Sequence, residues 1–503
     1  MPTEPLSNVD TAWLRMEGAS HPMMITMAMV FGAPLNLERL KAAFEERFLP
    51  FRRFRQRVVQ PPQPTGRPYW EDDPGFDLAH HLQATSLQPP GDEAALRDLI
   101  GELMSTQLDF SRPLWQFHLV EGYGEGCALV GRVHHCLADG PALLHVLAAM
   151  TSEGQVDPGP AVTSAASGAH PDRSLAAATL DATAWVAETL AEQGVKIVRN
   201  PLHLLRLARL GTGGAGALTK LLLRSPDPKT AFRGRLGPAK RAAWSAPIAL
   251  EEVKAVGLIV DGTVNDVMLA AATGALRRYL QGRGEPVDGL TIRTGLSVNL
   301  RSPDMKPQLG NHAGAFLVPL PIGVADPLER LGTVQRTMDA LKDSPEGAMV
   351  YGLLNALGMA PADTQQALVE RYCTGETVMT ANVPGPQETV HLAGAPLEML
   401  LFWVPSLGGV GLNLNMVSYA GQIRLGVATD ANLVPDPETI AGEFLVEFEA
   451  LRASAGKREA GDDLHAAGEA SMEAMSALLD EATRTLDALL ECREQEKGER
   501  SSD

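Results

Sequence analysis

The stretch GRVHHCLADGP, residues 131–141, contains two adjacent histidines, an aspartate four residues after the second, and a Gly-Pro pair. A neutral imidazole with a pKa near 6.5 can remove a proton from a hydroxyl group at physiological pH. Neighbouring side chains on a strand point to opposite faces, so His134 and His135 cannot present both rings to one substrate. We therefore expect one histidine to be chemical and the other structural.

The two residues after this pair that matter most are Asp139 and Gly140. Asp139 could order the turn by pairing with a buried arginine or by accepting backbone N–H bonds, and so fix the imidazole indirectly. Gly140 permits a backbone angle, or a close approach of a ligand, that a side chain would forbid. Because Pro141 suits the first position of a helix, the motif is expected at a strand-to-helix turn.

Three other interpretations of the motif compete with acid–base chemistry. A metal needs three or four ligands, whereas the turn supplies at most two and the chain has no H-E-x-x-H or C-x-x-C, so no metal is expected. Cys136 as a nucleophile would need an exposed thiolate next to a base, but it lies across the pleat from His135. For the motif taken alone, plain packing histidines remain an alternative.

The elements around the motif predict an N-terminal α/β unit, residues 1–155. Apolar or alternating runs indicate strands, and amphipathic runs indicate helices. The strands are expected at 24–33, 115–121 and 127–134, and the helices at 36–48 and 92–106. From 151 to about 170 the chain is rich in Gly, Pro, Ser and Ala, which is typical of a linker.

A second α/β unit is expected over 244–455, after a linker region at 156–243 and before an acidic tail at 456–503. Thr263, with Asp266 three residues later, forms a capping-box pattern that opens an amphipathic helix at 263–280. Further strands are predicted at 291–301, 313–322, 377–383 and within 410–430, and a closing helix at 436–453.

The composition is that of a soluble globular protein, with 45% hydrophobic and 21% charged residues in 503. That length favours two domains. Four cysteines without C-x-x-C spacing argue against a disulfide framework and fit the reducing cytosol, and the N-terminus shows no secretion signal. The uncharged window 399–423 contains Pro405 and a period of two, which favours a half-buried strand over a membrane-spanning helix.

Charge is unevenly spread along a chain whose net charge is −18. Residues 458–503 carry a net charge of −8, whereas residues 196–241 hold 11 basic side chains against the single Asp227, a net of +10. This basic segment includes a predicted short helix at 201–210 and one aromatic residue, which favours an anionic lipid surface over nucleic acid. Alternatively, the helix packs on the acidic body of its own protein.

The histidine motif resembles a known signature, and other segments resemble the same family. HHCLADG matches the HHxxxDG signature of the CoA-dependent acyltransferase superfamily, which includes chloramphenicol acetyltransferase and nonribosomal peptide condensation domains. Six further segments resemble successive motifs of the bacterial wax ester synthase/diacylglycerol acyltransferase family, in that family's order. They are PLSNVDTAWLRME (5–17), RPLWQFHLVEG (112–122), TVNDVMLAAATGALRRYL (263–280), LSVNLR (296–301), GNHAGAFLVPLPIGVADPLERL (310–331) and ANVPGP (381–386).

The resemblance covers most of residues 5–452 and implies an α/β fold of two chloramphenicol acetyltransferase-like domains with an active-site tunnel between them. It implies transfer of a fatty acyl group from acyl-CoA, a co-substrate, to diacylglycerol or a long-chain alcohol, with no cofactor. His135 would be the general base, and Asp139 and Gly140 would hold the turn. Such an enzyme is expected in the cytoplasm, peripheral to the inner membrane face or to lipid inclusions.

Other residues in these segments have structural as well as functional interpretations. Asn265 and Asp266 form a family motif that supports the site, although Asp266 could simply cap its helix. Trp115 is expected to pack in the core rather than to contact substrate. The alternation in LSVNLR predicts that Asn299 and Arg301 point inward.

Two of these segments carry more specific expectations. Arg301 is a candidate partner for Asp139, and Asn382, before a Pro-Gly-Pro run, is expected to shape a turn. The chain departs from the family pattern at Ala381, where serine is usual, and at TAFRG (230–234), where Thr-Pro-Leu-Asn-Gly is usual. These departures leave the preferred acceptor open.

Two other functions remain compatible with the sequence. One is acylation of a polyketide or another secondary-metabolite alcohol by an enzyme of the same superfamily. The other is a lipid-surface binding protein that keeps the fold without turnover. Direct transfer to a hydroxyl needs no covalent enzyme intermediate, and the chain has no G-x-S-x-G elbow that would indicate one.

Overall fold

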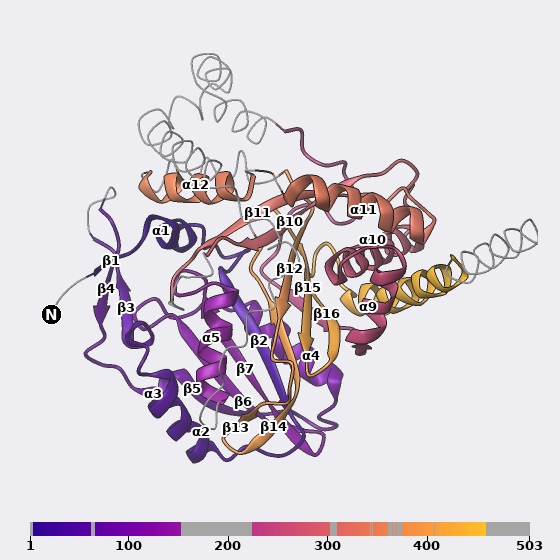
Figure 1. The fold of residues 1–503 in the computed structure, drawn as a ribbon. Helices are drawn as coiled ribbons and strands as arrows, with labels where there is room; N and C mark the ends of the chain where they lie inside the picture. Colours follow the sequence, from indigo (N-terminus) through magenta and orange to yellow (C-terminus); the bar gives the residue numbers. More distant parts are fainter. Residues whose placement is uncertain are drawn as a thin grey trace, which may run out of the picture.

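The computed structural model describes residues 4–458 apart from 62–65, 152–223, 302–308, 343, 345, 361–364, 366–368, 370–374 and 407. The predicted linker at 151–170, the short helix at 201–210 and the acidic tail therefore lie wholly or almost wholly outside the described residues. Figure 1 shows two sheets, one built mainly from the N-terminal part of the chain and one from the C-terminal part.

The first sheet has six strands in the order β13-β14-β2-β7-β6-β5. Its members are β2 (Met24–Phe31), β5 (Leu82–Ser86), β6 (Trp115–Tyr123), β7 (Gly126–His134), β13 (His391–Leu392) and β14 (Ala395–Trp403). Neighbouring strands are antiparallel except β5 and β6. Because β14 pairs with β2, strands from both halves of the sequence share this sheet, as the orange and indigo arrows in Figure 1 show.

The second sheet runs β11-β10-β12-β15-β16-β8, with β9 paired to β16. Its strands are β8 (Lys240–Trp244), β9 (Ile248–Ala249), β10 (Ile292–Asn299), β11 (Ala313–Leu320), β12 (Val378–Pro384), β15 (Leu412–Tyr419) and β16 (Gln422–Asp430). A small third sheet joins β1 (Glu4–Pro5), β4 (Tyr69–Asp72) and β3 (Gln56–Val59).

Helices cover the two large sheets. They are α1 (Asn8–Arg15), α2 (Leu37–Ala43), α3 (Leu78–His81), α4 (Glu93–Met104), α5 (Gly140–Thr151), α9 (Leu250–Ile259), α10 (Val264–Gly282), α11 (Pro327–Lys342), α12 (Glu346–Met359) and a helix over 437–458. A π-helical turn at Phe44–Phe48 and a 3₁₀ turn at Arg52–Arg55 follow α2. Side chains cap the starts of several helices, among them α1 by Ser7, α4 by Asp92 and α10 by the predicted box of Thr263 and Asp266.

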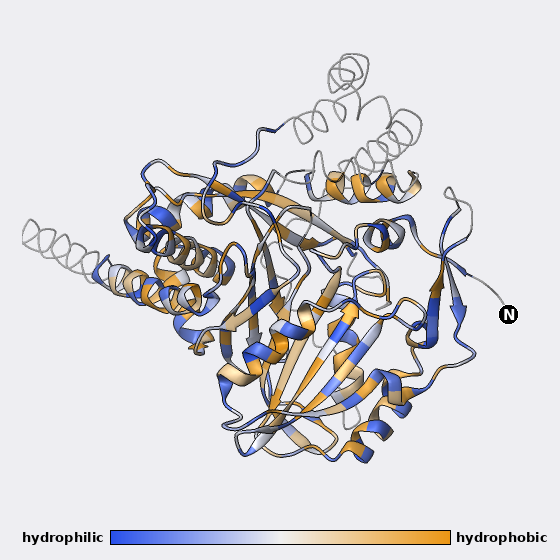
Figure 2. Ribbon diagram, turned by 180° about the vertical axis from the view of Figure 1, so that it is seen from behind, coloured by the Kyte–Doolittle hydropathy of each residue, from blue (hydrophilic) through white to orange (hydrophobic). Residues whose placement is uncertain are grey.

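Three apolar clusters hold these elements together. One lies against the first sheet and includes residues of α1, α5 and α12, and a second lies between the second sheet and α9–α11. The third lies between the two large sheets, where the ring centroids of Trp244 and Trp403 are 6.2 Å apart. Figure 2 shows the corresponding hydrophobic colour along the strands and the mixed faces of the helices.

The expected α/β architecture is confirmed, and so are most of the predicted elements in the described ranges. The uncharged window 399–423 contains strand residues of β14 and β15, and β15 is buried along its whole length rather than on one face. Within the described ranges no single helix is both long and apolar enough to cross a membrane, while α9 and α10, bent by 96°, pass such a test only as a pair.

Candidate active site

His134 is the last residue of β7, and its ring is held from two sides. Its Nδ1 accepts a hydrogen bond from the backbone N–H of Cys136 at 3.1 Å, so the ring hydrogen is on Nε2, 3.6 Å from a carboxylate oxygen of Glu17. The edge of the ring also faces Phe110. His134 is therefore a buried residue that ties the end of β7 to the loop before β2.

Glu17 fastens that loop through several contacts. Its carboxylate accepts hydrogen bonds from the backbone N–H of Met23 and from Gln107. Burial alone would raise the pKa of Glu17, but the contacts with His134, Met23 and Gln107 outweigh it and lower the pKa. An ionised carboxylate is thus favoured next to Nε2–H of His134.

His135 follows β7 and turns away from its neighbour. Its ring stacks on Trp13 of α1, with centroids 3.8 Å apart and planes inclined by 13°. Its backbone N–H donates to Met23 at 2.7 Å, and its carbonyl accepts from Asn311 at 2.7 Å. The two rings thus contact different elements, as the alternation of the strand predicts, and His135 is 6% exposed.

The surroundings of His135 keep its ring neutral. Burial lowers the pKa to about 4, and Asp139, the backbone carbonyl of His135 itself and Asn311 oppose that shift. At pH 7 almost every molecule therefore has an unprotonated ring that can accept a proton. Among the described residues, Nδ1 of this ring is buried without a hydrogen-bond partner.

This pKa gives a test by pH. We expect kcat/KM to stay level from about pH 8 down to about pH 5 and to fall only towards pH 4, because only the neutral ring is a base. Histidine in the unfolded chain binds a proton near pH 6.5, so folding stability falls below that pH and each assay should follow a brief pH jump. An acid limb centred near pH 6.5 in folded enzyme would contradict the assignment.

Asp139 connects the turn to the second half of the chain. Nη1 of Arg301 lies 2.8 Å and 2.7 Å from its two carboxylate oxygens, and the backbone N–H groups of His312 and Ala142 donate to it at 2.9 Å and 3.1 Å. Arg301 also donates to the carbonyl of Gly310 at 2.8 Å. The predicted contact between Arg301 and Asp139 is present, together with the backbone donors expected for Asp139.

Gly140 is the first residue of α5. It is not among the glycines with a positive φ, so the turn does not need glycine for its backbone angle. A Cβ at this position would meet no atom within 4 Å. The other expectation, a close approach by a ligand, stays a prediction.

Two side-chain predictions are wrong. Asn299 does not point inward: it is exposed where β10 ends, and its Oδ1 accepts from the backbone N–H of Arg301 at 3.1 Å. Asn382 does not shape a turn, because it lies within β12, in register with Met416 of β15. Strand pairing continues through Pro384, the last residue of β12, where a missing N–H is tolerated.

Asn265, Asp266 and Trp115 have mainly structural contacts. Asp266 completes the capping box with Thr263, and Asn265 accepts a 3.4 Å hydrogen bond from Asn382. Trp115 is 1% exposed, donates to the carbonyl of Phe54 at 2.7 Å and is surrounded by phenylalanines, as expected for a core residue. A supporting role for the pair 265–266 in catalysis stays a prediction.

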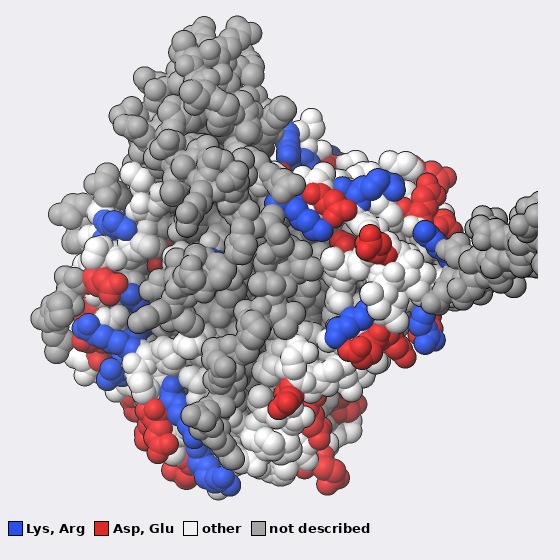
Figure 3. Space-filling model, viewed as in Figure 1, with Lys and Arg blue, Asp and Glu red and all other residues white. Residues whose placement is uncertain are grey.

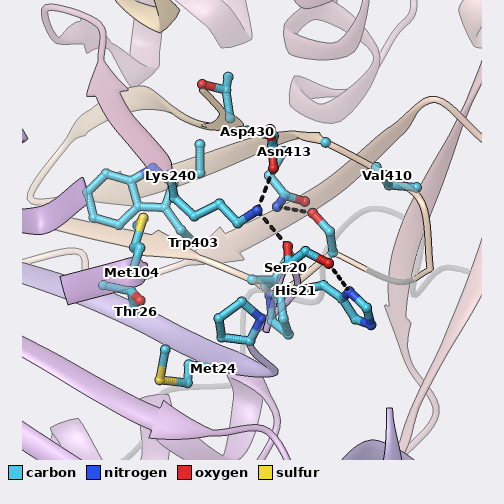
Figure 4. A pocket seen from close by; sticks show the side chains of 17 residues that line it. Ser20, His21, Met24, Thr26, Met104, Lys240, Trp403, Val410, Asn413 and Asp430 are labelled. Atoms are coloured by element: carbon cyan, nitrogen blue, oxygen red, sulfur yellow. Dashed lines mark hydrogen bonds and ion pairs between the residues drawn. The ribbon is translucent and has the colours of Figure 1, made fainter. Parts of the chain in front are cut away.

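A cavity of about 60 Å³ lies at the seam between the two sheets (Figure 4). It is lined by apolar side chains, among them Met24, Met104 and Trp403, and by the ion pair of Lys240 and Asp430, whose atoms lie 2.6 Å apart. Met24 is paired in register with His134, so the cavity adjoins the strand ends that hold the motif. Sites for small molecules typically occupy roughly 300–1,000 Å³, so this cavity alone cannot hold a fatty acyl group. The tunnel stays a prediction.

Of the competing interpretations, a Cys136 nucleophile finds little support in the geometry, whereas the burial of both histidine rings is compatible with plain packing. No group of three or more His, Cys, Asp or Glu side chains that could hold a metal is found in the described part of the chain. Cys136 is 1% exposed, and burial raises its pKa well above the usual value, which disfavours the thiolate that a nucleophile needs.

Three residues that contact the histidine pair are not predicted from the sequence, although each lies in one of the segments that resemble the family. Glu17 and Trp13 belong to PLSNVDTAWLRME, and Asn311 belongs to GNHAGAF. Their contacts with the histidine pair are long-range, and no local periodicity reveals them.

Comparisons with known proteins identify related chains. Residues 6–268 match the model of the wax ester synthase/diacylglycerol acyltransferase catalytic domain, and residues 309–452 match the WS/DGAT C-terminal domain. A putative diacylglycerol O-acyltransferase of Mycobacterium tuberculosis is 30% identical over 469 residues, covering 90% of this chain and 97% of its own. A probable diacylglycerol O-acyltransferase of the same organism is 28% identical over 454 residues, covering 87% and 93%.

Solved structures share the fold. The wax ester synthase/diacylglycerol acyltransferase from Marinobacter aquaeolei VT8 is similar with a TM-score of 0.64 and 23% identity, over 90% of this chain and all of that one. The first condensation domain of the calcium-dependent antibiotic synthetase is similar with a TM-score of 0.55 and 15% identity, over 90% and 96%.

Proposed function

Because the chain belongs to the wax ester synthase/diacylglycerol acyltransferase family and is an acyltransferase, we propose that it transfers a fatty acyl group from acyl-CoA to diacylglycerol or a long-chain alcohol. The observation that carries the mechanism is the neutral imidazole of His135, fixed at the junction of the two halves of the chain.

In the proposed mechanism His135 acts as general base and then as general acid. Its Nε2 takes the hydroxyl proton of the acceptor while the acceptor oxygen forms a bond to the thioester carbon. The tetrahedral intermediate then collapses, the carbon–sulfur bond breaks, and the proton passes from Nε2 to the sulfur of coenzyme A. Base catalysis of this kind typically contributes about 10² to 10⁴ in rate.

Burial determines how well this base works. It keeps the ring neutral and available, but it also makes the imidazolium costly when the proton arrives. The carboxylate of Asp139 offsets part of that cost through its charge, while its own contacts with Arg301, His312 and Ala142 keep it in place. In this proposal Asp139 acts on the base without touching substrate.

We propose that the enzyme works at an anionic lipid surface in the cytoplasm, on the membrane or on lipid inclusions. The net charge of +10 over residues 196–241 supports this. In the described part of that segment, Arg224, Lys240 and Arg241 pair with the protein's own carboxylates. Acidic and basic side chains also intermingle over the described surface in Figure 3. A lipid contact would therefore depend on the other cations of the segment, those of residues 196–223 together with the exposed Lys229 and Arg235.

The acceptor is tested by incubating purified protein with radiolabelled palmitoyl-CoA and one acceptor at a time. Dioleoylglycerol in neutral vesicles, dioleoylglycerol in vesicles with an anionic lipid, hexadecanol and a short alcohol form the panel. We expect a labelled ester with the two long-chain acceptors and faster transfer from the anionic vesicles, since each surface cation contributes about 1 kcal/mol to binding.

Three outcomes would overturn parts of the proposal. Ester formation with the short alcohol alone would favour the acylation of another metabolite, and thioester cleavage without acceptor-dependent ester would contradict transfer. Neither cleavage nor ester, from folded protein that sediments with vesicles, would favour a lipid-binding protein without turnover. Equal rates on both kinds of vesicle would contradict the anionic surface.

A further inference from the structure

Asn311 connects the N-terminal helix to the backbone of the proposed base. Its Nδ2 donates to a carboxylate oxygen of Asp10 in α1 at 2.7 Å and to the carbonyl of His135 at 2.7 Å. Asp10, Asn311 and His135 are 7%, 4% and 6% exposed. Because both amide hydrogens are used on acceptors, rotating the amide would place Oδ1 against two other oxygens, so its orientation is fixed.

Two buried atoms of these residues have no hydrogen bond of ordinary geometry. One is Oδ1 of Asn311, which is an acceptor, and the other is Nδ1 of the His135 ring. Unpaired polar atoms are uncommon in protein interiors. The backbone carbonyl of His135 itself and the Asn311 side chain both raise the pKa of His135, the direction expected of hydrogen-bond acceptors next to the ring.

We propose that Asn311 is a positioning residue whose Oδ1 accepts the Nδ1–H of His135 while its Nδ2 remains bonded to Asp10. The proton on Nδ1 then stays in place throughout the reaction, and Nε2 is left as the nitrogen that exchanges a proton with the substrates. Contacts of catalytic groups are often long or poorly aligned without substrate and tighten in the reacting complex. This inference rests on the proposed role of His135 as the base.

The contact between Oδ1 of Asn311 and Nδ1–H of His135 is expected to stabilise the transition state. When Nε2 takes the hydroxyl proton the ring becomes an imidazolium, and its bond to Oδ1 becomes charge-assisted and stronger. An interaction that strengthens only at that point raises kcat and leaves substrate binding almost unchanged. Asp10 fixes the amide so that Oδ1, and not Nδ2, faces the ring.

The first test replaces Asn311 by alanine and compares it with Asn355→Ala. Asn355 of α12 accepts a 3.0 Å hydrogen bond from Asn8 of α1, so the control removes a similar contact of α1 that does not reach His135. We expect Asn311→Ala to lower kcat by about 10- to 100-fold, with KM for palmitoyl-CoA and acceptor changed by less than about threefold. Asn355→Ala should keep the wild-type kcat. Equal effects of the two variants would overturn the inference.

The second test exchanges the two groups in the double variant Asp10→Asn/Asn311→Asp. The amide at position 10 can then donate to the carboxylate at position 311, whose other oxygen faces the imidazole, while the bond from position 311 to the carbonyl of His135 is lost. A negative charge there raises the pKa of the base. We expect the acid limb of kcat/KM to move to higher pH than in the wild type, whereas Asn311→Ala moves it to lower pH. Shifts in the same direction, or none, would overturn the inference.

A third measurement is independent of activity. Protein labelled with ¹⁵N in its histidine rings is compared with His135→Ala to identify the signals of His135. We expect the ring hydrogen on Nδ1 in the wild type and a larger share on Nε2 in Asn311→Ala. A hydrogen on Nε2 in the wild type, or an unchanged distribution in the variant, would overturn the inference. If the tautomer behaves as expected but His135→Ala keeps its activity, the proposed function fails and the contact with Asn311 stands.

Discussion

Replacing His135 by alanine will lower kcat for ester formation by about 10² to 10⁴-fold, because the acceptor hydroxyl then loses its proton only to water. The measurement is the steady-state rate with palmitoyl-CoA and the best acceptor of the panel. KM for palmitoyl-CoA is expected to change far less, since the ring acts in the transition state rather than in ground-state binding.

Two further variants separate chemistry from folding. The ring of His135 stacks on Trp13, so alanine also removes packing, and His135→Gln fills more of that volume without a basic nitrogen. It should be as inactive as the alanine variant but closer to the wild type in thermal stability. His80→Ala, which changes an exposed histidine of α3, should be fully active. Substantial turnover by folded His135→Gln would rule out His135 as the general base.

Replacing Arg301 by methionine will lower the free energy of unfolding by about 3–5 kcal/mol, the cost of leaving a buried charge without its partner. The Asp139 side chain is 2% exposed and that of Arg301 is 10% exposed, so water can barely replace the guanidinium. The measurement is the midpoint of urea denaturation. Activity should fall as well, because the turn that carries His135 loses its side-chain link through Arg301 to Gly310, and only the backbone bridge between Ala138 and Gly310 remains.

The matched control is Arg52→Met. Arg52 makes two hydrogen bonds to Asp72 at 3.0 Å and 2.8 Å, but the two side chains are 47% and 35% exposed, so water can replace the lost partner and a much smaller loss is expected. In the double variant Asp139→Asn/Arg301→Met no buried charge is left without a partner, so it should lose less stability than Arg301→Met alone, although the single amide oxygen keeps only one of the two bonds from His312 and Ala142. Equal losses in Arg301→Met and Arg52→Met would show that the buried pair has no special role.

Local sequence patterns predict the segment that carries the two histidines and Asp139. The apolar run before the two histidines and the Gly-Pro pair after them predict β7, the turn and α5. The period of two on a strand separates the roles of His134 and His135, and their contacts with Glu17 and Trp13 agree with it. The strand-to-helix turn also explains why Asp139 can reach the backbone N–H of Ala142.

The remaining features depend on which distant segments meet. No strand is predicted at 395–403, and no local pattern shows that β14 pairs with the distant β2 as well as with its sequence neighbour β13. The contacts of Trp13 and Asn311 with His135 arise from the docking of α1 and of the loop before β11. Asn299 is exposed because it shares a face of β10 with the half-buried Arg293 and Ser297, so the alternation of the strand directs its side chain away from the core.

Chemical rescue tests the base most directly. In His135→Gly the space beside Trp13 that the ring occupied is free for added imidazole, which supplies a basic nitrogen with no link to the chain. The measurement is the rate of ester formation from radiolabelled palmitoyl-CoA as imidazole, and then weaker and stronger imidazole derivatives, are added. Proton abstraction by His135 predicts a rate that rises with imidazole concentration and with the basicity of the derivative. A folded His135→Gly variant whose rate is already that of the wild type, or does not respond to imidazole bound beside Trp13, would contradict it.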